Sequence, residues 1–235
     1  MVRNDIHPTA VIADSVTMGV GNVIGPYVVL LGSTELGDGN WIGPHVAIGA
    51  PPEVMGHEHL NVWDGVDGAS GGVRIGSHNR VREFVTIHSG WAGRTSVGDD
   101  CFLMAKSHIG HDVCLHDRVT LSAGVALAGH VEVWPWANLG MLTSVHQKVL
   151  IGPGAMIGMG SSVRKDVPAF SITLGNPART TGINEIGLTR HGCPQGLVEP
   201  MVDYLLGRAE LPADLDPALR LVLTRWQDAR PDPTT

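Results

Sequence analysis

An aliphatic residue returns at every sixth position between residues 97 and 163, twelve times in succession. A small or β-branched residue stands two positions before most of them, so each six-residue unit offers two side chains to an interior. A period of six fits neither an amphipathic helix nor an alternating strand. Short units repeated many times are typical of a β-helix, in which each coil buries its inner face against its neighbours. The series is Val97, Leu103, Ile109, Leu115, Leu121, Leu127, Val133, Leu139, Val145, Ile151, Ile157 and Val163.

The same period begins near the N-terminus and is interrupted twice. It holds from Ile6 to Ile48, fails near residues 50–72, resumes, and fails again at residues 89–96. Both interruptions are expected to leave the β-helix as loop excursions. Loops as long as the first one are usually functional.

Beyond the repeats, the spacing of apolar residues becomes helical. It predicts one short helix over residues 184–191, a second over residues 197–206 and a third over residues 216–226. We therefore expect a mainly β chain, in which residues 1–178 form the parallel β-helix and residues 179–235 form a small α-helical C-terminal region. The helices are too sparse in apolar residues to form a core alone, so they are expected to pack on the β-helix or on a neighbouring subunit.

Charge and composition narrow the classes of function. The formal net charge is −7, and no basic run provides a face for phosphate backbones, so nucleic-acid binding is not expected. No apolar run approaches the roughly 20 residues that cross a bilayer, and the first residues lack a signal-peptide pattern. We expect a cytoplasmic protein without an integral membrane segment. The cysteines, Cys101, Cys114 and Cys193, lack metal-ligand spacing and are expected to be reduced, mostly packed thiols.

Three six-residue units make one triangular coil, so residues 18 apart stack in neighbouring coils about 4.8 Å apart. His111, Gly129 and Gln147 fall in one such column, and the phase of the repeat turns His111 outward. Four histidines gather within about two coils of this column: His108, His111, His130 and His146.

These histidines allow three interpretations. In the first, they are surface or core side chains without a chemical role. In the second, three of the imidazoles bind one zinc ion. In the third, one histidine is a general base, since imidazole titrates near neutral pH. The zinc hypothesis is weakened because His108 and His111 stand three apart and do not repeat as a ligand pair. The general-base hypothesis is favoured by Asp112, which follows His111, and by the Gly129 N–H, which can stabilise an oxyanion. With the amide of Gln147, the column indicates acyl transfer.

Several motifs surround this column. They are Ser107-His108-Ile109-Gly110-His111-Asp112, Leu127-Ala128-Gly129-His130-Val131, Val145-His146-Gln147, Gly175-Asn176-Pro177-Ala178-Arg179, Ile6-His7-Pro8-Thr9-Ala10 and the run from Asn79 to His88. In order and phase they resemble the UDP-N-acetylglucosamine acyltransferases that begin lipid A synthesis. The resemblance covers about residues 5–195.

This resemblance implies a left-handed parallel β-helix and a homotrimer with active sites between subunits. It implies an acyl donor carried on the phosphopantetheine arm of acyl carrier protein and a nucleotide-sugar acceptor, with no bound cofactor and no metal. His111 matches the general base, Asp112 the residue that supports it, and Gly129 the oxyanion donor. The resemblance also implies substrate-binding positions: His108, His130, His146 and Gln147 toward the sugar, nucleotide or cleft, and Arg190 toward the nucleotide phosphates or the carrier protein.

One position bears on the length of the acyl chain. Met159 matches the floor of the family's acyl groove, where glycine accompanies longer chains and methionine shorter ones. Met141 lies one coil below Met159 and crowds the same groove. We therefore expect a medium or short donor, 3-hydroxyacyl or similar, although methionine as plain core filler is the alternative.

The first excursion departs from the family pattern. It lacks the family's Asp-Leu-Lys-Tyr stretch and Gly-Glu pair and carries His57, Glu58, His59, Trp63 and Asp64 instead. The acceptor is therefore left open, and so is an acyl-coenzyme A donor with another sugar or an amine. Two further hypotheses keep the fold: a zinc-dependent hydratase of the γ-carbonic anhydrase kind and a non-catalytic trimeric scaffold.

Overall fold

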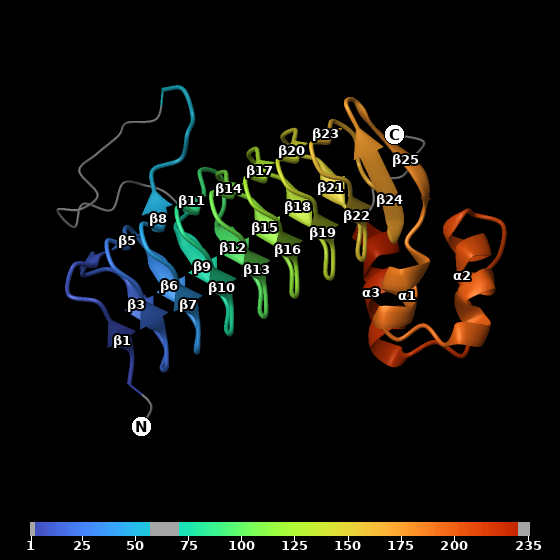
Figure 1. Ribbon diagram of the computed structural model, residues 1–235, viewed down its shortest axis with the longest axis horizontal. Coiled ribbons are helices and arrows are strands. Elements are labelled where there is room, and N and C mark those ends of the chain that lie inside the picture. Colours follow the sequence, from blue (N-terminus) through green and yellow to red (C-terminus); the bar gives the residue numbers. More distant parts are fainter. Residues whose placement is uncertain (1–2, 57–70, 230–235) are drawn as a thin grey trace.

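The computed structural model describes residues 3–56 and 71–229 (Figure 1). Short parallel strands wind through about 9 turns of a left-handed parallel β-helix, and three helices follow at its C-terminal end. The predicted fold class is confirmed. The distinctive residues of the first excursion, His57, Glu58, His59, Trp63 and Asp64, lie outside the described residues.

Three sheets form the faces of the prism. Sheet A holds β1 (Asp5–Ile6), β4 (Val23–Ile24), β7 (Trp41–Ile42), β10 (Arg80–Val81), β13 (Phe102–Leu103), β16 (Thr120–Leu121), β19 (Asn138–Leu139), β22 (Met156–Ile157), β24 (Ser171–Gly175) and β25 (Ala178–Ile183). Sheet B holds β2 (Val11–Ile12), β5 (Val29–Leu30), β8 (Ala47–Ala50), β11 (Thr86–His88), β14 (His108–Ile109), β17 (Ala126–Leu127), β20 (Ser144–Val145) and β23 (Ser162–Val163). Sheet C holds β3 (Thr17–Met18), β6 (Thr34–Leu36), β9 (Val73–Ile75), β12 (Thr95–Val97), β15 (Cys114–Leu115), β18 (Glu132–Val133) and β21 (Leu150–Ile151).

The chain visits sheets B, C and A in turn, so each coil has an A/B corner, a B/C corner and a C/A corner. The aliphatic series forms the core, where Leu103, Ile109 and Leu121 are fully buried. Residues stacked in neighbouring coils are 18 apart along most of the prism, 39 apart across the first excursion and 22 apart across the second. The coil arithmetic read from the sequence therefore holds from β1 to β23 wherever no excursion intervenes. The last coil is two residues shorter, since Ile157 pairs with Thr173 and Ile151 with Val167.

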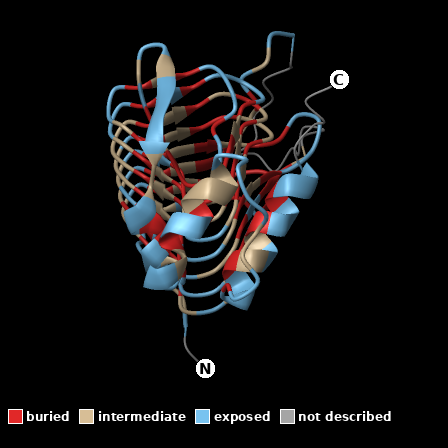
Figure 2. Ribbon diagram, turned by 90° about the vertical axis from the view of Figure 1, so that its right-hand side faces the viewer, coloured by how far each residue is buried: buried red, intermediate tan, exposed pale blue. Residues whose placement is uncertain are grey.

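The predicted helices are present and pack on the end of the prism (Figures 1 and 2). They are α1 (Glu185–Arg190), α2 (Val198–Leu205), preceded by a 3₁₀ turn η2 (Gln195–Leu197), and α3 (Pro217–Ala229). Asn184 caps α1 by accepting a hydrogen bond from the Gly187 N–H. A second apolar core joins the helices to Trp134 and Phe170. The helices thus bury their apolar faces on the C/A corner, as their sparse composition predicts.

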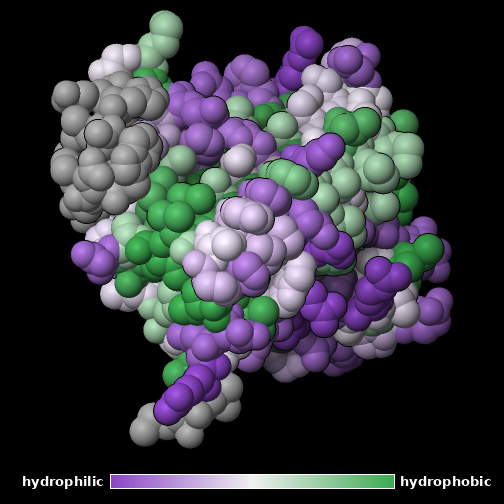
Figure 3. Space-filling model, turned by 60° about the vertical axis from the view of Figure 1, so that its left-hand side comes forward, coloured by the Kyte–Doolittle hydropathy of each residue, from purple (hydrophilic) through white to green (hydrophobic). Residues whose placement is uncertain are grey.

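The boundary predicted at residue 178 falls at the first residue of β25, which pairs antiparallel with β24. The β part therefore continues to Ile183 before the first helix begins. Within the described part of the chain, no helix is long and apolar enough to span a bilayer. Figure 3 shows apolar side chains gathered over the first coils, where Ile6, Val11 and Val23 are exposed.

The three cysteines are free thiols in different surroundings. Cys101 and Cys193 are buried, as expected, and burial raises the pKa of the Cys101 thiol to about 12. Cys114 instead lies half-exposed on the outer face of sheet C. Two of the thiols are therefore packed, whereas the third remains open to ligands or reagents.

Candidate active site

The B/C corner collects most of the residues singled out in the sequence. The turn between β14 and β15 carries His111 and Asp112, and the next coil places Gly129 and His130 at the same corner. Both excursions leave from this corner as well, since the first joins β8 to β9 and the second joins β11 to β12. One edge of the prism therefore combines an ordered column with the two irregular loops.

His111 and Asp112 form a tightly held pair. The His111 Nδ1 lies 2.8 Å from an Asp112 carboxylate oxygen. The same carboxylate accepts hydrogen bonds from three backbone N–H groups of the second excursion, those of Trp91 at 3.0 Å, Ala92 at 3.0 Å and Gly93 at 2.6 Å. The Asp112 side chain is only 6% exposed. The excursion thus fixes the carboxylate that orients the imidazole.

The charge of Asp112 follows from these contacts. Burial raises the pKa of its carboxyl, but the hydrogen bonds from His111 and the backbone N–H groups outweigh burial and hold the pKa below its ordinary value. Asp112 is therefore a carboxylate at neutral pH. When Asp112 accepts a hydrogen bond from the Nδ1–H of a neutral His111, the other ring nitrogen keeps its lone pair.

Gly129 lies directly against the His111 ring, as the coil spacing predicts. A Cβ atom added at Gly129 would stand 2.4 Å from both Cε1 and Nε2 of His111. Only glycine leaves room for the imidazole at this point of the column. Among residues 3–56 and 71–229, no acceptor is found for the Gly129 N–H. A backbone donor therefore lies beside the His111 ring, on the side of the nitrogen that does not contact Asp112.

His130 completes a compact group with this pair. Its ring meets the His111 ring edge to face, with 5.0 Å between centroids, and its Nε2 lies 3.7 Å from the Asp112 carboxylate. His108 does not join this group, although the sequence placed all four histidines together. It lies on the outer face of β14, nearer the middle of sheet B.

A second polar group surrounds His108. Its Nδ1 lies 3.0 Å from the Thr86 hydroxyl, its Nε2 lies 3.2 Å from the Glu53 carboxylate, and its ring centroid lies 5.2 Å from that of His88. Burial is the main cause that lowers the pKa of His108 below its ordinary value; Glu53 partly opposes this, and His88 adds to it. The imidazole is therefore neutral at pH 7.

Sequence reasoning missed Glu53 and His88 as site residues. His88 ends the run that begins at Asn79, and Glu53 closely follows β8, so both leave the prism at the B/C corner. Their positions in the sequence could have identified them, because Glu53 and His88 stand at the start of the two excursions, directly after the six-residue period ends. Each polar group at this corner contains two imidazoles and one carboxylate, so three converging imidazoles are not found among the described residues.

Comparison with known proteins agrees with this geometry. No family model matches the chain. Its structure matches the UDP-N-acetylglucosamine acyltransferase of Francisella novicida with a TM-score of 0.72 and 30% sequence identity, over 97% of this chain and 90% of that one. The chain belongs to the UDP-N-acetylglucosamine acyltransferase family.

Two further relatives support this family membership. The UDP-N-acetylglucosamine O-acyltransferase of Moraxella catarrhalis matches with a TM-score of 0.67 and 30% identity, over 95% of this chain and 92% of that one. An acyl-[acyl-carrier-protein]–UDP-N-acetylglucosamine O-acyltransferase of Burkholderia thailandensis is 47% identical over 121 residues, which cover 50% of this chain and 46% of the relative. The chain therefore spans about half the length of the curated relatives it matches. The resemblance predicted from the motifs is confirmed.

The remaining family positions lie at different corners. His146 and Gln147 lie at the B/C corner, one coil beyond Gly129; both are exposed, and the His146 Nδ1 lies 3.2 Å from the Gln147 carbonyl oxygen. Met159 lies at the A/B corner and is 74% exposed, and Met141 below it is 49% exposed. These two corners bound the outer face of sheet B, so the methionines and histidines of this family member share one face.

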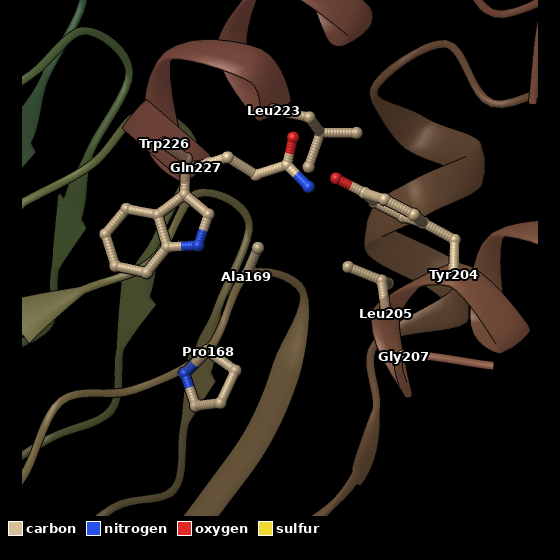
Figure 4. Close-up of a pocket in the computed structure, with 8 residues that line it drawn as sticks. All are labelled: Pro168, Ala169, Tyr204, Leu205, Gly207, Leu223, Trp226 and Gln227. Carbon is tan, nitrogen blue, oxygen red and sulfur yellow. The ribbon is translucent and has the colours of Figure 1, made fainter. Parts of the chain in front are cut away.

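Arg190 is not brought to that face. It ends α1 and precedes His191, whose ring stacks on Trp136 at the C/A corner with 4.9 Å between centroids. A cavity of about 240 Å³ also lies on the helical side, between α2, α3 and the chain before β24 (Figure 4). Its lining consists of Pro168, Ala169, Tyr204, Leu205, Gly207, Leu223, Trp226 and Gln227. Within one chain, both features are therefore separate from the B/C corner.

Proposed function

We propose that this protein transfers an acyl group from acyl carrier protein to a hydroxyl of UDP-N-acetylglucosamine, a reaction that serves lipid A synthesis. The name of the Burkholderia thailandensis relative states acyl carrier protein as donor and O-acylation of UDP-N-acetylglucosamine, and the name of the Francisella novicida protein states a UDP-N-acetylglucosamine acyltransferase. The observation that carries the proposal is the His111 imidazole, which is oriented by a buried carboxylate and set against the backbone of Gly129. Base, orienting group and oxyanion donor are the groups that acyl transfer requires.

The reaction follows from this arrangement. The Nε2 of His111 takes the proton of the acceptor hydroxyl, whose oxygen attacks the thioester carbonyl. Asp112 stabilises the imidazolium that forms, and the Gly129 N–H donates to the oxyanion of the tetrahedral intermediate. The intermediate collapses to the ester, and His111 returns the proton to the departing phosphopantetheine thiolate. The balance of the step needs no metal and no further reactant.

The acceptor is held by the polar groups beside the base. Glu53 accepts hydrogen bonds from sugar hydroxyls, while the neutral His108 offers one donor and one acceptor nitrogen. His130, His146 and Gln147 extend this polar surface along the B/C corner. Arg190 supplies a positive charge for nucleotide phosphates or for the acidic carrier protein, from a subunit other than the one that supplies His111.

The substrates bind between subunits of a homotrimer. The side chains of His111, His130 and His108 are 16%, 31% and 32% exposed on an outer corner of one chain. A substrate at such an exposed corner can be enclosed only if a second protein surface faces it, and a neighbouring subunit supplies that surface. Met159 and Met141 then narrow the acyl groove, so the donor is a medium or short chain, 3-hydroxyacyl or similar.

Mass spectrometry of reaction products tests this function. Acyl carrier protein loaded with chains of increasing length is offered with UDP-N-acetylglucosamine and with a panel of other UDP-sugars, and acyl-coenzyme A is supplied in parallel. We expect an acylated UDP-N-acetylglucosamine formed from the carrier-bound donor. Acylation of no nucleotide sugar would overturn the acceptor, and product from acyl-coenzyme A alone would overturn the donor.

A further inference from the structure

Three potential ligands meet on the outer face of sheet C, away from the acyl-transfer site. Cys114 lies on β15 and His116 directly follows that strand; both are partly exposed on the outer side, while Leu115 between them is buried in the core. Glu132 is the direct partner of Cys114 in the next coil, on β18. The thiol sulfur, an imidazole nitrogen and a carboxylate oxygen all lie within 4.8 Å of one another.

The surroundings hold these side chains in place. The Nε2 of His116 lies 2.8 Å from the Glu132 carboxylate. The His116 ring stacks on Trp134 with 4.8 Å between centroids, and Trp134 in turn meets the edge of Trp226 from α3. Trp134 is buried, so one face of the imidazole is fixed while its outer side stays open to solvent. A preorganised ligand set loses less entropy when it binds an ion.

We propose that Cys114, His116 and Glu132 bind a divalent transition-metal ion, with zinc the preferred occupant. One sulfur, one nitrogen and one oxygen donor suit zinc or cobalt, whereas calcium and magnesium require oxygen ligands. Zinc bonds of about 2.0–2.3 Å place tetrahedral ligands roughly 3.3–3.8 Å apart, which small side-chain shifts from the observed spacing provide. A water molecule takes the fourth position.

The bound ion joins two neighbouring coils at the place where α3 docks. It ties β15 to β18 and braces His116 against Trp134, so it stabilises the junction between the prism and the helices. Among the described residues, the other two groups with metal-binding geometry, one at the B/C corner and one beside it on sheet B, contain no sulfur. A thiolate signature therefore distinguishes this site from them.

Cobalt titration of the chelator-treated protein tests the proposal. Burial lowers the pKa of His116, but the hydrogen bonds and charges of Cys114 and Glu132 outweigh burial and raise it to about 9, so the ion must displace the His116 proton. At a pH of about 8, we expect a thiolate-to-cobalt charge-transfer band that saturates near one equivalent and is bleached by zinc. Glu132→Gln should weaken cobalt binding about tenfold or more. Cys114→Ser should abolish the band, whereas the matched control Cys193→Ser, which removes a buried thiol outside the group, should retain it.

Two further readouts complete the test. Zinc should raise the midpoint of thermal unfolding of the wild type and leave that of Cys114→Ser unchanged. Circular dichroism verifies that each variant is folded. Absence of the band in the wild type, its persistence in Cys114→Ser, or unchanged affinity in a folded Glu132→Gln would each overturn the site. Acyl transfer does not involve these residues, so Cys114→Ser should retain the wild-type rate whatever the acceptor.

Discussion

The A/B and B/C corners are built by the same six-residue unit but differ in what they carry. At the A/B corner, the position two residues after each buried aliphatic residue of sheet A is occupied in successive coils by Ala105, Ala123, Met141 and Met159. At the B/C corner the same position gives His111, Gly129 and Gln147, and both excursions emerge there. The inward residues form the core that determines the fold of each coil. The outward positions at the corners do not contribute to that core, so they can hold catalytic or binding side chains.

Register shows why this freedom exists. Ile87, before the second excursion, pairs with Ile109, and Val97, after it, pairs with Leu115, so the inserted residues leave the core positions of both flanking sheets in phase. The disturbance is local: the pairing of β11 with β8 shifts register between Ile87 and His88, at the base of the two excursions. Loops can therefore be added at one corner to orient polar groups without loss of the fold, and the following predictions test this division.

Replacing the proposed base should have the largest effect. His111→Ala should lower the turnover number by about 10²–10⁴-fold, because it removes the group proposed to take the acceptor proton, and should leave the thermal midpoint unchanged. Ala105→Ser changes the equivalent position of the A/B column and should retain the wild-type rate. Steady-state kinetics with carrier-bound donor measure both. Full activity of the His111→Ala variant would show that the B/C corner does not take part in catalysis.

The next largest effect is expected at Gly129. The new Cβ of Gly129→Ala would stand 2.4 Å from the His111 ring, so the imidazole must move from its place. We expect the turnover number to fall about 10²-fold with little loss of stability, since the tip of a side chain yields more readily than backbone. Gly182→Ala is the control, because nothing lies within 4 Å of its added Cβ. Equal activity of the two variants would contradict the stacking of base on backbone.

Asp112→Asn should lower stability as well as rate. An amide offers one acceptor oxygen where the carboxylate accepts from His111 and three backbone N–H groups, so the free energy of unfolding should fall by roughly 1–3 kcal/mol at neutral pH. The pKa of Asp112 is lower in the folded state than in the unfolded one, so its contribution is present above the ordinary pKa.

The stability difference should therefore shrink as the pH falls through the folded-state pKa. Urea unfolding of wild type and variant at several pH values measures it. Asp5→Asn, an exposed change on β1, should alter the free energy of unfolding by less than about 0.5 kcal/mol. A difference between wild type and Asp112→Asn that is independent of pH would show that the charge of Asp112 does not hold the second excursion.

The smallest effect is expected at the A/B corner. Met159→Gly should shift the ratio of kcat/KM between longer and shorter acyl donors about tenfold toward longer chains, because the groove deepens by the length of one side chain. Met159→Ala separates side-chain length from backbone freedom and should shift the ratio in the same direction. An unchanged chain-length profile in both variants would leave Met159 as a surface residue without a role in selection.

Much of the structure can be predicted from the sequence because residues 18 apart stack on each other in neighbouring coils. The rule places Gly129 against His111, and the same rule pairs Cys114 with Glu132. It fails across the excursions, where inserted residues change the count. Glu53 was missed for that reason, and the three N–H groups that hold Asp112 come from an irregular loop whose conformation no repeat encodes.

The histidines show a second limit of the sequence rule. Residue spacing predicted one group of four, whereas the structure divides them, because His108 belongs to the face of sheet B and His111 to its corner. Helical spacing located α1, but not the corner on which it packs, since docking depends on apolar contacts distant in sequence. Arg190 therefore lies apart from His108, His111 and the other histidines of the B/C corner in its own chain.

The constant spacing of stacked residues also bears on how the chain folds. Contacts between residues 18 apart in a chain of 235 correspond to a relative contact order of about 0.08, in the range of helical bundles rather than β-sandwiches. Folding can therefore advance one coil at a time from any formed nucleus. The step across the first excursion closes 39 residues and costs only about 0.7 kcal/mol more in chain entropy than an ordinary step. An excursion of this length thus adds little to the chain-entropy cost of assembling the coils.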